Sequence, residues 1–296
     1  MPEAPATDAD IPAYWQGLGL PGLADIHVHF LPDAMLRKVW DYFDQAEANY
    51  GLAWPIHYRL GEQERLETLR GFGVRAIPSL TYPHKPGMAQ WLNEWCADFA
   101  ERVPDAVHSA TLYPEEGVAD YVAAALDAGA RLFKMHVQVG QFSPADERLD
   151  RAWGHLQDAG APVVIHAGSA PKPGRFTGPG PVRDLLGRFP RLVLVIAHLG
   201  MDEYDGFADL VEEFPRVHLD TTMAGTDFSD VFAPLPADYI RRLADLGDRV
   251  VLGADFPNIP YPYAEQLQAL HRLGLGEDWL RNVLWHNGAR LMGLTA

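Results

Sequence analysis

The stretch LADIHVHF, residues 23–30, alternates apolar and polar residues, which is the period of a β-strand. Residues two apart on a strand share a face, so we expect His27 and His29 to point the same way, with Asp25 below them. Two imidazoles side by side at a strand end are a natural chelate for a divalent metal. The alternative is two unrelated histidines, one of them packed and the other exposed.

The length and composition of the chain favour one large domain. The chain has 296 residues, of which 48% are hydrophobic, so a sizeable core is available. A single α/β barrel takes about 250 residues, and we therefore expect one domain over residues 1–296. The Pro-rich, acidic start lacks the features of a signal peptide. We expect residues 1–20 to form a loose tail.

The formal net charge of −16 argues against nucleic acid or an anionic membrane as a partner, because both would repel an acidic surface. No apolar run is long enough to span a bilayer. We expect a small-molecule substrate, and a homodimer is left open. The single cysteine, Cys96, fits a reducing cytoplasm and lies in an amphipathic helical stretch, where it is expected to pack.

Strands and helices are predicted to alternate eight times along the chain. This alternation predicts a parallel sheet, and eight units in about 270 residues favour a closed (β/α)8 TIM barrel, an α/β fold. An open doubly wound sheet would need a Gly-rich phosphate loop after the first strand, and the sequence has FLPD there. The predicted strands cover residues 23–30, 74–80, 106–112, 130–137, 162–166, 192–198, 217–221 and 250–255.

A long segment without clear periodicity follows the first strand and its helix. Residues 46–60 contain Tyr50, Trp54 and Tyr58, and this aromatic content argues against disorder. Long loops in compact domains are commonly functional. We expect this segment to be part of a lid over the catalytic end of the barrel.

Polar residues interrupt the apolar strands near their C-terminal ends, where the active site of such a barrel lies. A buried imidazole after an apolar run needs a hydrogen-bond or metal partner. Any one of these histidines could be a satisfied core residue, but their joint placement at one end of a barrel favours a site. The residues are His27 and His29, Lys134 and His136, His166, His198, and Asp255.

Together with the local sequences AHLG at residues 197–200 and GADFP at residues 253–257, these strand ends resemble the amidohydrolase superfamily. The nearest branch is the amidohydrolase-2 group, which includes aminocarboxymuconate-semialdehyde decarboxylase. The resemblance extends from about residue 23 to residue 291. It is informative about fold and metal, and it says little about the substrate.

The resemblance implies that His27, His29, His166 and Asp255 ligate one divalent metal, with Zn²⁺ as the expected ion. Such a metal would lower the pKa of a bound water from 15.7 to near 7. Asp255 would accept the proton of that water and pass it on. His198 would polarise the substrate carbonyl or stabilise the developing oxyanion.

Other superfamily branches carry a carboxylated lysine that bridges two metals, which leaves two interpretations of Lys134. We favour an uncarboxylated Lys134 that binds or orients the substrate, with His136 beside it as a substrate contact or as a group that supports the residues of the site. Trp54 is a third candidate for substrate binding. Arg175 is a fourth, and its alternative is an ordinary surface charge.

Asp220, at the end of the seventh predicted strand, is expected to support His198 as a hydrogen-bond acceptor. Its alternative role is to cap a helix or turn.

Two enzymatic functions share this set of residues. The first is a hydrolase acting on an amide, lactone or ester bond of a small, anionic substrate. The second is a lyase, a nonoxidative decarboxylase of an aromatic or enol carboxylic acid, for which the aromatic segment 46–60 is suited. A non-enzymatic barrel is disfavoured because every expected ligand position is filled. The ligands cannot separate hydrolase from decarboxylase.

Overall fold

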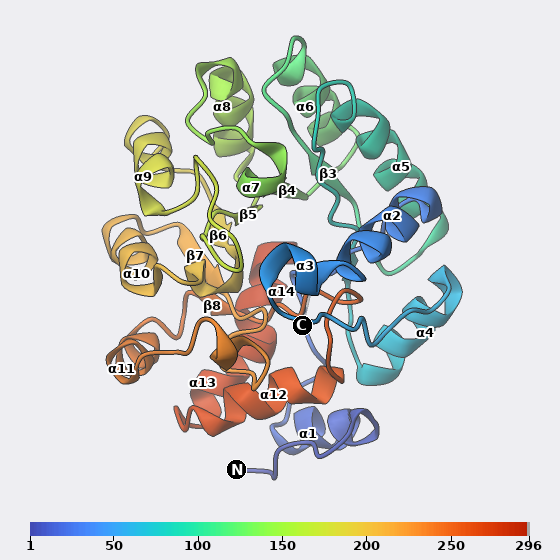
Figure 1. Ribbon diagram of the computed structural model, residues 1–296, viewed down its shortest axis with the longest axis vertical. Coiled ribbons are helices and arrows are strands. Elements are labelled where there is room, and N and C mark those ends of the chain that lie inside the picture. Colours follow the sequence, from blue (N-terminus) through green and yellow to red (C-terminus); the bar gives the residue numbers. More distant parts are fainter. Residues whose placement is uncertain (295–296) are drawn as a thin grey trace. The chain divides into compact units, whose positions relative to one another are not determined.

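The computed structural model describes residues 1–294, and its strands and helices alternate along the chain (Figure 1). The chain divides into two compact units, one formed by residues 1–77 with 221–294 and the other by Pro78–Asp220. We call them unit 1 and unit 2 and describe each by itself.

From the second predicted strand on, the elements follow the predicted order, but the strands are shorter and the third predicted strand, residues 106–112, is divided in two. The strands are β1 (Ile77–Pro78), β2 (Ala106–Val107), β3 (Ser109–Thr111), β4 (Leu132–His136), β5 (Val163–His166), β6 (Leu194–Ile196), β7 (Val217–Asp220) and β8 (Val250–Val251). The α-helices are α1 (Ile11–Gly17), α2 (Asp33–Phe43), α3 (Ala46–Tyr50), α4 (Glu62–Phe72), α5 (Ala89–Arg102), α6 (Val118–Asp127), α7 (Val137–Gly140), α8 (Asp150–Ala159), α9 (Pro179–Arg188), α10 (Tyr204–Glu213), α11 (Ala237–Asp245), α12 (Tyr263–Arg272), α13 (Glu277–Arg281) and α14 (Asn287–Met292). The short helical turns are η1 (Asp8–Asp10), η2 (Glu147–Leu149), η3 (Ala197–Gly200), η4 (Ser229–Val231) and the π-helical η5 (Asn282–His286).

Unit 2 is built on a parallel sheet in which β3, β4, β5, β6 and β7 lie side by side in sequence order. The register pairs Lys134 with Val164, and His136 with His166. The strands are buried on both faces, as expected of a parallel sheet covered by helices. Parallel pairing in this register brings the C-terminal ends of β4 and β5 together, so their terminal histidines are neighbours.

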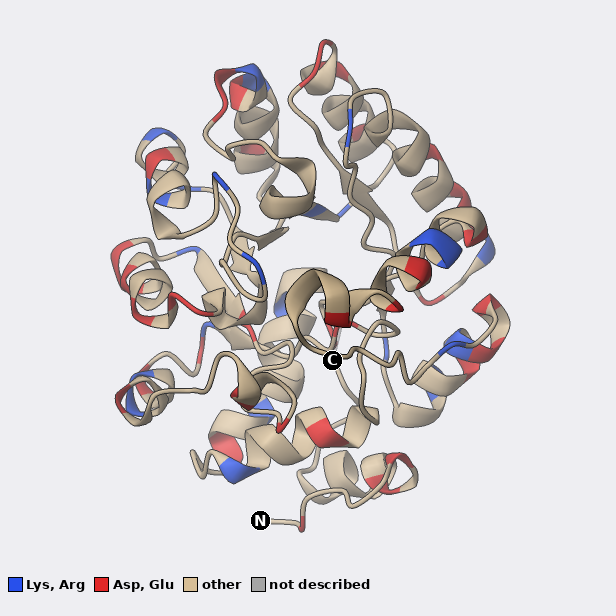
Figure 2. Cartoon of the chain, in the orientation of Figure 1, with Lys and Arg blue, Asp and Glu red and all other residues tan. Residues whose placement is uncertain are grey.

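Helices cover the outer side of this sheet in unit 2. α6 packs against α8, and α9 packs against α10 (Figure 1). Charged residues lie chiefly on the helices, whereas the strands are largely free of them (Figure 2). This distribution follows from burial, because a charge in the strand core would lose its hydration. The alternation of elements confirms the predicted α/β class.

The first 20 residues are not the loose tail that the sequence suggested. They form η1 and α1, and α1 buries Ile11, Tyr14 and Trp15. Trp15 Nε1 donates a hydrogen bond to the carbonyl oxygen of Phe72 at 3.0 Å, which ties α1 to the end of α4. Burial of these side chains supplies the free energy that orders the segment.

The predicted first strand, residues 23–30, is not a regular strand, and the backbone bends at Ile26. It makes only isolated bridges within the described residues, between Leu23 and Val74 and between Val28 and Phe256. The side chain of Asp25 accepts the N–H groups of His27 and Ala254, and this side-chain bonding interrupts the backbone ladder. His27 and His29 nevertheless lie side by side, with ring centroids 5.1 Å apart.

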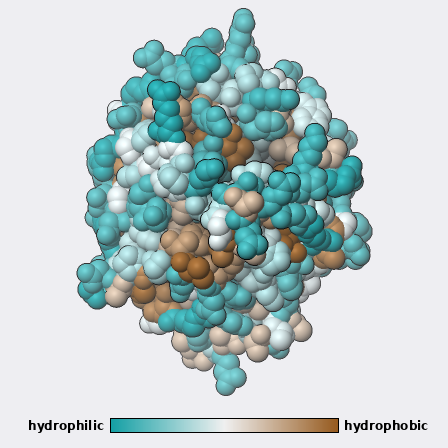
Figure 3. Space-filling model, viewed as in Figure 1, coloured by the Kyte–Doolittle hydropathy of each residue, from teal (hydrophilic) through white to brown (hydrophobic). Residues whose placement is uncertain are grey.

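The segment 46–60 begins with α3 and continues without regular structure in unit 1. Trp54, Ile56 and Tyr58 are buried there. Within residues 1–294, no helix combines the length and the apolar character needed to cross a membrane. On the face seen in Figure 3, hydrophilic residues cover much of the surface and hydrophobic residues occupy smaller areas.

Candidate functional site

His27, His29 and Asp255 form a compact group in unit 1. Each offers one ligand atom, and these atoms all lie within 4.8 Å of one another. His29 Nε2 lies 2.9 Å and His27 Nε2 lies 3.8 Å from Asp255 Oδ1. Both imidazoles are almost fully buried, with exposed fractions of 1% and 2%. Two nitrogens and a carboxylate oxygen directed at one point are a donor set that suits a divalent transition metal.

Hydrogen bonding fixes the ring of His27. Its Nδ1 shares a hydrogen bond of 3.1 Å with Thr222 Oγ1, and the opposite nitrogen, Nε2, faces Asp255. A partner on one ring nitrogen sets the tautomer and the orientation in which the other nitrogen meets a metal. Sequence reasoning missed Thr222, since nothing local to residue 222 indicates a contact with residue 27.

Asp255 adopts a left-handed backbone conformation, with φ of 64°. A residue other than glycine rarely does so, and such conformations gather at functional sites. The turn is held by neighbours in the same unit, because Asp255 N donates to the carbonyl oxygen of His27 at 2.8 Å. The carboxylate is thereby fixed next to the two imidazoles.

A second group of histidines lies in unit 2. The rings of His136 and His166 are stacked, with centroids 4.0 Å apart and an angle of 11° between their planes. The ring of His198 meets that of His166 edge to face at 4.6 Å, and the ring of Tyr82 lies 5.0 Å from His136. The predicted fourth ligand, His166, thus lies in this cluster. Its role as a ligand stays a prediction.

The sequence suggested that His198 ends a strand, but β6 ends before it, at Ile196. It lies in η3 after β6, with a left-handed φ of 58°, and its N–H donates to Asp220 Oδ1 at 2.9 Å. Asp220 thus accepts a hydrogen bond from His198, its predicted partner, through the backbone N–H of that residue. This bond holds the turn that carries the imidazole.

The two predicted cationic substrate contacts lie in different environments. Lys134 is in the middle of β4 with 1% of its surface exposed. Arg175 is exposed, and its guanidinium lies over the ring of Phe176 at 5.0 Å. The exposure of Arg175 fits the alternative of an ordinary surface charge, whereas the burial of Lys134 demands polar neighbours.

Trp54 lies next to the segment that follows Asp255, within unit 1. Its Nε1 donates to the carbonyl oxygen of Asn258 at 2.7 Å, and its ring meets that of Phe228 at 4.7 Å. Nearby Tyr261 is buried, and burial together with the charge of Asp255 raises the pKa of its hydroxyl well above the usual value. The predicted lid segment thus contacts the loop that carries a candidate ligand.

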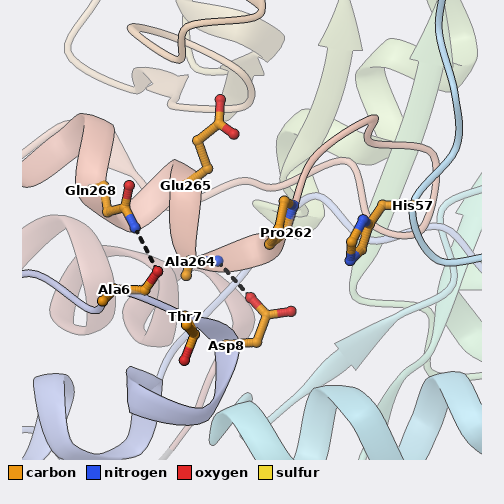
Figure 4. A pocket seen from close by; sticks show the side chains of 8 residues that line it. All are labelled: Ala6, Thr7, Asp8, His57, Pro262, Ala264, Glu265 and Gln268. Atoms are coloured by element: carbon orange, nitrogen blue, oxygen red, sulfur yellow. Dashed lines mark hydrogen bonds between the residues drawn. The ribbon is translucent and has the colours of Figure 1, made fainter.

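A separate surface pocket of about 380 Å³ lies in unit 1 (Figure 4). Asp8 and Gln268 point into it, and Asp8 accepts the N–H of Ala264 at 2.8 Å. None of its lining residues belongs to the candidate metal group. They are Ala6, Thr7, Asp8, His57, Pro262, Ala264, Glu265 and Gln268.

Solved structures with the same fold cover nearly the whole chain. An uncharacterised TIM-barrel protein of Bordetella bronchiseptica matches with a TM-score of 0.73 and 19% identity, over 91% of this chain and 98% of that one. A candidate 2-pyrone-4,6-dicarboxylic acid hydrolase of Pseudomonas putida matches with a TM-score of 0.64 and 15% identity, over 93% and 99%. The 5-carboxyvanillate decarboxylase of Sphingomonas paucimobilis matches with a TM-score of 0.60 and 15% identity, over 93% and 100%.

These matches confirm the predicted TIM-barrel fold. Curated proteins gave no match to the sequence. The model of the amidohydrolase family matches residues 24–294, which is nearly the whole chain and includes both histidine groups. The family consists of metal-dependent enzymes, and His27, His29 and Asp255 supply a candidate metal site here. The chain therefore belongs to the amidohydrolase family.

Proposed function

We propose that the protein is a metal-dependent hydrolase that cleaves an amide, lactone or ester bond of a small anionic substrate. The observation that carries this proposal is the approach of His27 Nε2 and His29 Nε2 to one oxygen of Asp255, at 3.8 and 2.9 Å. His166 is the proposed fourth ligand, and zinc is the proposed ion. Three imidazoles and a carboxylate are a common donor set for Zn²⁺.

A bound divalent ion supplies Lewis acidity and acidifies water near neutral pH. Asp255 is the proposed proton acceptor, because its carboxylate is held by the turn after β8 beside both imidazoles. It would take a proton from water and later deliver it to the leaving group. His198, fixed by its bond to Asp220, is the proposed donor to the oxygen on which negative charge develops.

Lys134, His136, Trp54 and Arg175 stay proposed substrate contacts. Trp54 is the best supported, because its bond to Asn258 ties it to the segment after Asp255. Arg175 is the weakest, since its guanidinium rests on Phe176 at the surface. A cytoplasmic location and a homodimer stay predictions from the sequence.

The second candidate function is nonoxidative decarboxylation of an aromatic or enol carboxylic acid. Two aromatic rings lie against that of Trp54 in unit 1: the centroid of Phe43 is 5.1 Å away and that of Phe228 is 4.7 Å away. Such a group of rings suits a planar substrate. Structural neighbours include a 5-carboxyvanillate decarboxylase and a 2,6-dihydroxybenzoate decarboxylase as well as the candidate 2-pyrone-4,6-dicarboxylic acid hydrolase. The two functions require the same metal ligands.

One experiment tests the site and separates the reactions. Purified protein is analysed for metal and is then assayed against lactones, amides, esters and aromatic acids, with evolved CO₂ as the readout for decarboxylation. We expect about one equivalent of zinc and cleavage without CO₂. Protein without metal after growth in added zinc would contradict the site assignment.

Two further results would change the proposal in defined ways. Release of CO₂ from an aromatic acid would establish the decarboxylase. Two tightly bound ions per chain would support a carboxylated Lys134 that bridges them.

A further inference from the structure

Asp25 is a fully buried carboxylate that contacts both segments bearing the candidate metal ligands of unit 1. Its Oδ1 accepts the N–H of His27 at 3.0 Å and the N–H of Ala254 at 3.1 Å. Its Oδ2 accepts the hydroxyl of Tyr263 at 2.7 Å. His27 is itself a candidate ligand, and Ala254 directly precedes the candidate ligand Asp255. One carboxylate oxygen therefore joins the two ligand-bearing segments.

The backbone bonds between these segments use other groups. Asp255 N donates to the carbonyl oxygen of His27 at 2.8 Å, and His29 N donates to that of Phe256 at 2.7 Å. The N–H groups that point to Asp25 lie where this pairing is irregular. An unsatisfied buried N–H is costly, so the carboxylate provides the acceptor that a regular ladder would otherwise supply.

Tyr263 completes the arrangement from the start of α12. Burial and the charge of Asp25 raise the pKa of its hydroxyl well above the usual value, so the hydroxyl stays protonated and donates. The backbone N–H of Tyr263 donates to Tyr58 Oη at 2.7 Å, and the Tyr58 hydroxyl donates to Asp8. Asp8 also accepts the N–H of Ala264 (Figure 4). The carboxylate is thus held from a third direction by a well-connected tyrosine.

We propose that Asp25, oriented by Tyr263, is a positioning residue that sets the spacing of His27 and His29 relative to Asp255 and thereby the metal affinity. This inference rests on the proposed metal site. Asp25 is fully buried and accepts two backbone N–H groups and the Tyr263 hydroxyl, so we assign it to positioning and not to catalysis. Groups that orient metal ligands commonly change metal affinity or activity by 10–100-fold when they are removed.

Three variants separate the parts of this arrangement. Asp25→Ala removes the bonds to His27, Ala254 and Tyr263. Asp25→Asn keeps an oxygen for the two N–H groups and places an amide that can donate to the Tyr263 oxygen, so it should act as a conservative rescue. Tyr263→Phe removes only the hydroxyl. Tyr14→Phe is the matched control, because it deletes another buried tyrosine hydroxyl in the same unit, bonded to His271 at 3.1 Å.

The measurement is metal affinity of the stripped full-length protein. Zn²⁺ is titrated against a chromophoric chelator, and the visible spectrum of bound Co²⁺ reports ligand geometry. We expect affinity to fall roughly 100-fold in Asp25→Ala and about 10-fold in Tyr263→Phe. Asp25→Asn should stay within about 10-fold of the parent, and Tyr14→Phe should match it.

If Asp25→Ala fails to fold, as circular dichroism would reveal, Asp25→Asn and Tyr263→Phe carry the test. A Tyr263→Phe variant that folds and keeps the parent's affinity and Co²⁺ spectrum overturns the inference. So does an Asp25→Ala variant with unchanged affinity. A parent protein that binds neither ion overturns the proposed metal site as well, which distinguishes the two failures.

Discussion

The histidines of unit 1 and those of unit 2 differ in the groups that their rings contact. In unit 1, His27 and His29 face the carboxylate of Asp255, and their nitrogens converge on one of its oxygens. In unit 2, the ring of His166 stacks on that of His136 and meets that of His198 edge to face. Histidines at predicted strand ends therefore give a candidate chelate in one unit and a stack of imidazoles in the other.

The backbone explains the difference. Asp255 reaches its imidazoles through a left-handed turn that is bonded to the carbonyl oxygen of His27. His136 and His166 are partners in the regular register of β4 and β5, and that register places their rings side by side. Regular pairing produces ring stacking, whereas an irregular turn brings a carboxylate to the imidazoles.

The largest effect is expected from replacing the proposed metal ligands, and it tests whether His166 binds the same ion as His29. His29→Ala and His166→Ala should each lose bound metal, and activity should fall by roughly 10³-fold or more, because the metal supplies several kcal/mol of stabilisation. His155→Ala, in helix α8, is the control and should keep both. Metal analysis beside kcat decides the matter. If His166→Ala keeps its metal, the stack of unit 2 supplies no ligand.

A smaller effect is expected when His198 is replaced, because we assign it to catalysis and not to the metal. His198→Ala should keep nearly all of its metal while kcat falls by about 10²-fold or more, as for loss of an electrostatic stabiliser. The measurement is again metal content and kcat. A variant that loses its metal as completely as His166→Ala would make His198 a ligand.

Removal of the Thr222 hydroxyl, which bonds to His27, should have a smaller effect still. Thr222→Val removes the partner of His27 Nδ1, and metal affinity should weaken by about 10-fold because the imidazole loses its orientation. Thr222→Ser keeps the hydroxyl and serves as the matched control. Titration of the stripped protein with Zn²⁺ checks this prediction, and equal affinity of both variants would refute it.

The last prediction concerns Cys96, which is buried in α5 of unit 2 and is not assigned to the site. Burial raises the pKa of its thiol from 9.0 to about 11, so the thiolate is scarce at pH 8 and its reactivity should rise with pH. Native protein should react with a thiol reagent at least ~100-fold more slowly than protein unfolded in denaturant. Fast modification of the native protein would contradict the assignment of Cys96 as a packing residue.

The sequence alone determined the order of the elements and the pairing of His27 with His29. Both predictions rest on local periodicity, and His27 and His29 lie together even though the structure assigns no regular strand there. The local sequence around Asp255 also indicated its place in a candidate metal site, through resemblance to a known superfamily. The sequence did not predict that the N-terminal residues are well structured, because this depends on the hydrogen bond from Trp15 to Phe72, which lies far along the chain.

Only the tertiary structure decided which groups hold the candidate ligands. The bond from Ala254 to Asp25 spans 229 residues, and the bond between Thr222 and His27 spans 195. No local pattern encodes such contacts, because a carboxylate or hydroxyl becomes an acceptor or donor for a distant group only when folding brings the two together. The left-handed turns at His198 and Asp255 belong to the same class, since surrounding hydrogen bonds hold conformations that local preference disfavours.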